Sequence, residues 1–126
     1  AADPQNFTMW KGRDFRALTT SGPLEDFGKY SGRVNFRDKS GVVESHPDQA
    51  EIFIIESGEA TLGLGGTHVN PKPAGPGDVR SETATGAQKI AVAAGDIVRI
   101  PPGMAHQFFL APGKTVAYLA LKVTVK

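Results

Sequence analysis

The sequence predicts an all-β domain that closes as a small barrel or a sandwich, and three observations lead to this prediction. The chain has 126 residues, a length typical of one domain. Its 15 glycines and 9 prolines are spread along the chain, as expected where many tight turns join strands. No segment longer than about ten residues keeps a helical period with caps. We therefore expect about eight to ten short strands.

The first strands of this set lie in the middle of the chain. Residues 34–37 alternate apolar and polar side chains, the pattern of a half-buried strand. Residues 51–56 form a β-branched and aromatic run that ends at Ser57 and Gly58. Residues 60–64 follow and are predicted to be the hairpin partner of that run.

The second half of the chain contains a long irregular segment and then further strands. Residues 70–86 are rich in proline and glycine and almost devoid of large apolar side chains, so we predict a long surface loop. Residues 90–92, 97–100, 106–110 and 115–125 are predicted strands because apolar runs there lie between glycine- and proline-containing turns.

Composition excludes several classes of protein and of site. The formal net charge is +1, which argues against nucleic acid as the main partner. There is no cysteine, so disulfides, cysteine-ligated zinc and iron–sulfur clusters are excluded. No apolar run approaches the roughly 18 residues of a membrane span, so no membrane partner is expected. The start Ala1-Ala2-Asp3 resembles the end that a signal peptidase leaves, which makes export an expectation and a cytoplasmic location the alternative.

Two of the three histidines lie near acidic residues. Glu44 and His46 are two residues apart, so on a strand their side chains point to the same face. Glu51 opens the next predicted strand, and His106 begins a later one. Two histidines and one or two carboxylates that meet inside a barrel form a divalent-metal site. The third histidine, His68, is expected to be an exposed residue with no part in the site.

The spacing around His106 resembles the second motif of the cupin superfamily, G-x5-P-x-G-x2-H-x3-N. Gly95, Pro101, Gly103 and His106 match at every spacing, and Leu110 replaces the final asparagine. The glycines lie at predicted turns that favour positive φ. Proline stiffens the corner before the histidine.

The first cupin motif, G-x5-H-x-H-x3,4-E-x6-G, matches more loosely. His46, Glu51 and Gly58 correspond to its second histidine, its glutamate and its closing glycine. Glu44 replaces its first histidine, and Asp38 stands where its opening glycine is expected. The resemblance covers roughly residues 34–123 and implies a single cupin barrel over residues 30–126, with residues 1–29 as an N-terminal arm or edge strand.

A second alignment of the first motif places His46 at its first histidine and Asp48 at its second. Only two residues would then separate Asp48 from Glu51, which is shorter than the family pattern, and Pro47-Asp48 has the composition of a turn. Spacing and strand parity favour Glu44 over Asp48 as the additional carboxylate.

The resemblance implies that Glu44, His46, Glu51 and His106 hold a divalent metal ion. Two neutral histidines and two carboxylates favour manganese, iron(II) or zinc over copper(I). The leading hypothesis is a metal-dependent enzyme, of dioxygenase, isomerase or lyase type, that acts on a small organic substrate. Glu44 is either a ligand or a free general base. The alternative is a non-catalytic barrel that binds a sugar or an anion.

Cupins commonly pair, and the N-terminal stretch contains apolar residues with no clear place in one barrel. Trp10, Phe15 and Leu18 are the residues of this kind. We therefore predict a homodimer with this arm at or near the interface.

Overall fold

The computed structural model describes residues 5–12 and 20–126, and this part of the chain contains β-strands and no α-helix. The predicted all-β fold is therefore confirmed. The strands are β1 (Gly22–Asp26), β2 (Tyr30–Arg37), β3 (Val43–Ser45), β4 (Gln49–Leu64), β5 (Thr67–His68), β6 (Lys72–Pro73), β7 (Val79–Ser81), β8 (Ala84–Thr85), β9 (Gln88–Ala93), β10 (Ile97–Ile100), β11 (His106–Phe109) and β12 (Val116–Thr124). Within the described ranges, no helix has the length and apolar character needed to cross a membrane.

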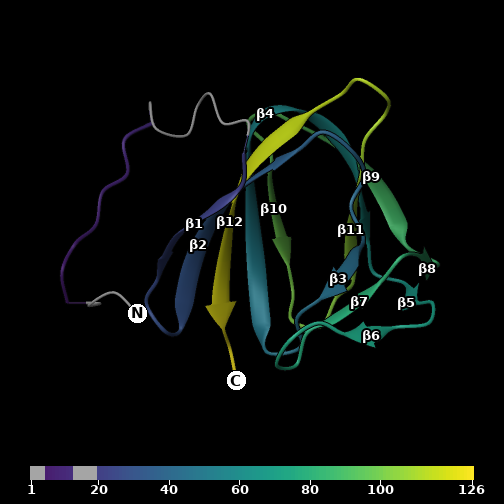
Figure 1. The fold of residues 1–126 in the computed structure, drawn as a ribbon, viewed down its shortest axis with the longest axis horizontal. Coiled ribbons are helices and arrows are strands. Elements are labelled where there is room, and N and C mark those ends of the chain that lie inside the picture. Colours follow the sequence, from purple (N-terminus) through teal and green to yellow (C-terminus); the bar gives the residue numbers. More distant parts are fainter. Residues whose placement is uncertain (1–4, 13–19) are drawn as a thin grey trace.

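Two antiparallel layers face each other and share strand β4 (Figure 1). The first layer has the order β1-β2-β12-β4, with β10 on the other side of β4. The second layer has the order β4-β11-β3-β7-β6, with β9 on the other side of β4. Strands β5 and β8 form a separate two-stranded sheet.

Strand β4 belongs to both layers because it bends near Gly58. Its first half pairs with β10 and β12, and its second half pairs with β9 and β11. Gly58 has φ +79°, and a Cβ atom there would lie 1.9 Å from the carbonyl oxygen of Thr115. Only glycine fits this close approach. The predicted hairpin between residues 51–56 and 60–64 is therefore wrong: Gly58 marks a corner within one strand and not a turn between two.

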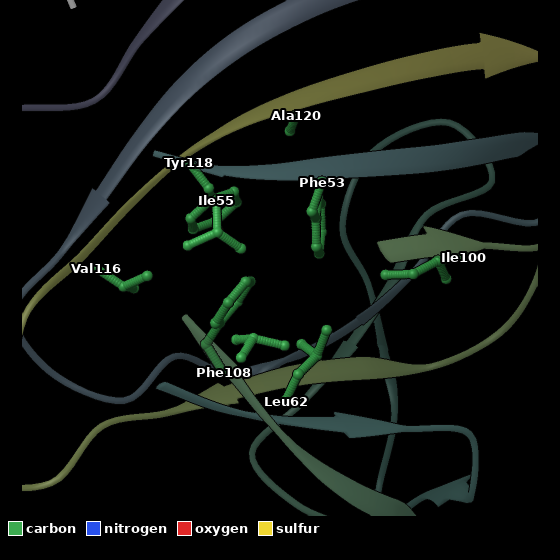
Figure 2. Packing of buried hydrophobic residues seen from close by; sticks show 9 residues of the cluster. Phe53, Ile55, Leu62, Ile100, Phe108, Val116, Tyr118 and Ala120 are labelled. Atoms are coloured by element: carbon green, nitrogen blue, oxygen red, sulfur yellow. The ribbon is translucent and has the colours of Figure 1, made fainter. Parts of the chain in front are cut away.

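The core lies between the two layers (Figure 2). Its buried members come from both layers: Phe53, Ile55, Leu62, Val92, Ile100, Phe108, Val116, Tyr118 and Ala120. The rings of Phe108 and Tyr118 stack with centroids 4.4 Å apart, and Phe53 packs against both. Complete burial of a leucine-sized side chain stabilises the fold by about 1.5–3 kcal/mol.

The segment 70–86 is mostly exposed, as its composition predicts, but it is not irregular throughout. It contains β6, β7 and β8, and β7 pairs with β3 in register Glu44↔Arg80. Short strands joined by proline and glycine escape prediction because they bury few apolar side chains. Through β7, this segment forms part of the wall around the predicted site.

The N-terminal region lies at the edge of the first layer, where β1 pairs with β2. The segment before it carries Phe7, Met9 and Trp10, all exposed. Phe15 and Leu18, the other two apolar residues predicted to lie at a subunit interface, fall outside the described residues.

Candidate metal centre

Adjacent strands bring Glu44, His46 and His106 together. Glu44 lies in the middle of β3, His46 follows the end of that strand, and His106 is the first residue of β11. His106 lies directly opposite Glu44 in the β11–β3 pairing, so the two side chains share a face. One potential ligand atom from each of the three residues lies within 4.8 Å of the others.

Glu51 completes this group from the other layer, since it lies in the first half of β4. Its Oε1 atom is 3.0 Å from His46 Nε2 and 3.2 Å from His106 Nε2. The Oε2 atom of Glu44 is 3.8 Å from the same His46 nitrogen. His46, Glu51 and His106 are all buried, whereas Glu44 is half-buried at the edge of the cavity.

The buried polar atoms in this group converge without satisfying one another. Neither ring nitrogen of His46, nor Glu51 Oε1, has a hydrogen bond of acceptable geometry among the described residues. Buried polar atoms rarely lack a hydrogen-bond partner. Two ligand atoms about 2.1 Å from an octahedral metal, at right angles, are about 3.0 Å apart. The donor types and their spacing therefore fit a divalent ion.

The second nitrogen of each imidazole faces an oxygen atom. His106 Nδ1 is 3.4 Å from the carbonyl oxygen of Met104, and His46 Nδ1 is 3.0 Å from Asp78 Oδ1. At His106 the carbonyl accepts a hydrogen bond, and at His46 the negative charge of Asp78 acts by proximity; both favour a proton on Nδ1 and leave the lone pair of Nε2 free. Both Nε2 atoms are those that approach Glu51. The surroundings therefore favour the tautomer that metal ligation by Nε2 needs.

Burial and charge oppose each other at these groups. Burial lowers the pKa of His106, and the nearby Glu51 carboxylate does not offset it. Burial also acts to lower the pKa of His46, but the carboxylates of Glu51 and Asp78 outweigh it and raise that pKa. Burial acts to raise the pKa of Glu51, and the two histidines overcome it, so that pKa is lowered. Glu51 is thus held as a carboxylate, which is the form that binds a cation.

Asp78 and Arg80 extend the group, and sequence reasoning did not identify either. The Nε atom of Arg80 is 3.3 Å from Glu44 Oε1, which leaves Oε2 of that carboxylate on the His46 side. Both residues belong to segment 70–86, which the sequence predicted to be a loop. The strand alternation of Val79–Ser81 was the only available signal, and three residues are too short to carry it.

Asp48, the alternative carboxylate, is exposed in the turn after His46. Among the described residues, its carboxylate forms no contact within 4.0 Å of a histidine nitrogen, whereas those of Glu44 and Glu51 both approach His46 Nε2. The structure therefore brings Glu44, and not Asp48, close to the two histidines.

His68 is not the exposed bystander that the sequence predicted. It is half-buried, with Nε2 2.9 Å from Ser45 Oγ and Nδ1 2.6 Å from Ser81 Oγ. The hydroxyl of Ser81 donates to the carbonyl of Thr83, so it accepts the Nδ1 proton of His68. The two serine partners lie on β3 and β7, so His68 bridges these two strands.

A cavity of about 660 Å³ opens above the group of potential ligands. Glu44, Glu51 and His106 line one part of it, and Phe53 and Tyr118 line another. Charged and polar side chains make up most of the lining, and aromatic rings line much of the rest. A cavity of this volume is large enough for a small organic molecule.

The fold and this site now allow a comparison with known proteins. No protein-family model and no curated protein matches the sequence. Solved structures do match. A cupin protein from Bacteroides fragilis has a TM-score of 0.53 and 22% identity, over 76% of this chain and 66% of that chain. The chain has the cupin fold.

Of two further solved structures, one covers more of the chain and the other carries a named activity. A protein from Klebsiella pneumoniae with a double-stranded β-helix domain has a TM-score of 0.65 and 13% identity, over 96% of this chain and 93% of that chain. A hydroquinone 1,2-dioxygenase from a Sphingomonas species, with 4-hydroxybenzoate bound, has a TM-score of 0.56 and 14% identity. The match covers 79% of this chain but only 62% of the dioxygenase, less than two thirds of its length.

Proposed function

We propose that this cupin barrel binds one divalent metal ion and acts on a small organic molecule in the adjoining cavity. One observation supports this most strongly: two imidazole Nε2 atoms approach the same buried carboxylate oxygen of Glu51 without hydrogen-bond geometry at His46. The shared fold with a hydroquinone dioxygenase lends further support to a metal-dependent enzyme.

In this proposal His46, Glu51 and His106 are ligands, and Glu44 supplies a fourth through Oε2. Two carboxylates and two neutral imidazoles favour manganese, iron(II) or zinc. A bound ion of this kind polarises a carbonyl, enol or phenol oxygen as a Lewis acid. Asp78 orients the ring of His46, and Arg80 holds the Glu44 carboxylate in place. Phe53 and Tyr118 exclude water from the cavity wall.

Glu44 has a second possible role in the same reaction. Its 3.8 Å distance from His46 Nε2 exceeds that of Glu51, and it lies at the cavity edge. If three residues suffice to hold the ion, Glu44 takes a proton from the substrate at Oε2, and Arg80 holds the carboxylate in position through Oε1. A dioxygenase, an isomerase and a lyase can each use a base in this position.

Elemental analysis tests the proposal directly. The full chain is purified without chelators and without a histidine tag, and its metal content is measured. We expect one manganese, iron or zinc ion per chain, with anomalous scattering between the two histidines. A metal-free protein that gains none on incubation with these ions would contradict the proposal and favour a non-catalytic binding barrel.

We also propose that the protein is a homodimer through its N-terminal segment. Phe7 is 93% exposed and Met9 65% exposed, and Trp10 lies beside them, also exposed. Large apolar side chains clustered on one exposed segment are typical of an interface. Light scattering should give twice the chain mass, and replacement of Phe7 and Met9 by serine should give a monomer. A wild-type monomer at all practical concentrations would contradict this proposal.

A further inference from the structure

The cavity face of β2 and β12 carries polar side chains that have no partner. Arg33 and Asn35 on β2, and Lys122 on β12, line the cavity. Among the described residues, none of these three side chains has a hydrogen bond or ion pair. Arg37, on the same face of β2, differs: its Nε atom donates to the Tyr118 hydroxyl at 3.0 Å, and its guanidinium lies over Phe108.

The strand register places the unpaired cations beside each other. Arg33 lies opposite Ala120, and Lys122 is two residues further along β12 on the same face. Such diagonal neighbours lie about 7–8 Å apart, within reach of one anionic group by two long side chains. Asn35 lies opposite Tyr118 and adds an amide to the same face. Since Ala120 is small, the space between the two cations stays open.

The same register connects these cations with the candidate metal centre. Lys122 lies opposite Glu51, and Ala120 lies opposite Phe53, in the pairing of β12 with β4. Lys122 and Glu51 are not within ion-pair distance, although both line the cavity. Lys122 is half-buried, and its positive charge acts to lower the pKa of Glu51 from beyond ion-pair distance.

Acidic residues also border the cavity, but they do not neutralise the two cations. Glu25 and Asp26 lie on β1 and line the cavity. Asp26 accepts a hydrogen bond from the backbone of Gly28, and neither carboxylate forms an ion pair with a described cation. Glu44 is paired with Arg80. Arg33 and Lys122 thus have no ion-pair partner among the described residues, and the Glu25 carboxylate borders the same cavity, likewise unpaired among them.

We infer that Arg33 and Lys122, with Asn35, form a subsite for the carboxylate of a small aromatic or enolic acid. The carboxylate lies between the two cations, and the planar part lies along Phe53 and Tyr118 toward the metal centre. This assignment of the substrate class rests on the proposed function, but the subsite itself is defined by the cations. The Tyr118 oxygen accepts from Arg37, so its own hydrogen is available to an oxygen of the ligand.

Benzoate and benzamide test the inference because they share shape and differ in charge. Their affinities are measured by calorimetry for the full chain with its metal as isolated, and for Arg33→Gln, Lys122→Gln and the double variant. Arg99→Gln is the matched control, since Arg99 is exposed on β10 away from the cavity. We expect each single variant to weaken benzoate about tenfold. Benzamide affinity should stay unchanged in every variant, and Arg99→Gln should behave as wild type.

Equal affinities of wild type for benzoate and benzamide would overturn the inference. A benzoate preference that survives in the double variant would also overturn it, because the carboxylate would then bind the metal or another group. Metal content of the same samples separates this inference from the proposed function. A metal-free protein that prefers benzoate through Arg33 and Lys122 contradicts the metal proposal and supports the subsite. A metal-loaded protein that does not prefer benzoate supports the metal proposal and contradicts the subsite.

Discussion

The interior of the barrel has a polar end and an apolar end, and one strand passes through both. Along β4, the inward residues change from Glu51, against two histidines, to Phe53 and then to Ile55 in the sealed core. The ring of Phe53 packs edge-on against His106 and in a tilted arrangement against Phe108. The β-strand period sets which residues face inward, but not their chemistry. Residues of the candidate site and residues of the stabilising core therefore lie only a few positions apart along the same strand.

Loss of a metal ligand at the polar end should have the largest effect. His106→Ala should weaken metal binding roughly 1,000-fold or more, about 4 kcal/mol, because it removes the only described ligand from β11. Metal content and circular dichroism should show a folded, metal-free protein. His68→Ala is the matched control, because His68 bridges two serines outside the ligand group. Full occupancy in His106→Ala would show that the centre is elsewhere.

A truncation at the apolar end should lower the stability of the fold and leave metal binding unchanged. Leu62 is completely buried, so Leu62→Ala should lower the free energy of unfolding by about 3 kcal/mol through lost contacts and a cavity. Metal content of the folded protein should not change. Thermal and chemical unfolding, followed with and without chelator, measure both quantities. Loss of metal from a folded Leu62→Ala protein would mean that the two ends are coupled.

The cupin fold could be predicted because its signals are local. The turn glycines of the second motif do have positive φ, +94° at Gly95 and +79° at Gly103, as the spacing predicted. The corner at Gly58 was mistaken for a hairpin because glycine between two apolar runs has the same appearance in both cases. Only the pairing partners of each half, far away in the chain, distinguish them.

The surroundings of the candidate site could not be predicted, for a different reason. Asp78 and Arg80 reach Glu44 and His46 only through the pairing of β3 with the three-residue strand β7. So short a strand buries too little apolar surface to leave a pattern in the sequence. Strand parity indicated Glu44 and His46, and the resemblance to the two cupin motifs added Glu51 and His106; these are the residues that now lie together.

Glu44 and Asp48 offer a comparison within the polar end itself. Glu44→Gln should weaken metal binding about 100-fold, since a neutral amide is a poor ligand for a hard cation. Asp48→Asn should leave the affinity unchanged, because Asp48 is exposed in the turn. Competition with a fluorescent chelator measures both constants. The reverse pattern would establish Asp48 as the ligand, and wild-type binding in both variants would leave Glu44 for acid–base chemistry.

The smallest effect is expected at Asp78, which acts on the centre only through His46. Asp78→Asn keeps the size of the side chain but removes the charge 3.0 Å from His46 Nδ1. Loss of such a partner typically costs 10–100-fold in metal affinity, and we expect about tenfold because the Asp78 side chain is 31% exposed.

In metal-free protein the Asp78 carboxylate raises the pKa of His46, so His46 should titrate at lower pH in the variant, as followed by NMR. Easier deprotonation alone would favour metal binding, so a weaker affinity would show that orientation and basicity of the ring dominate. Unchanged affinity together with unchanged titration would mean that Asp78 does not act on His46 at all.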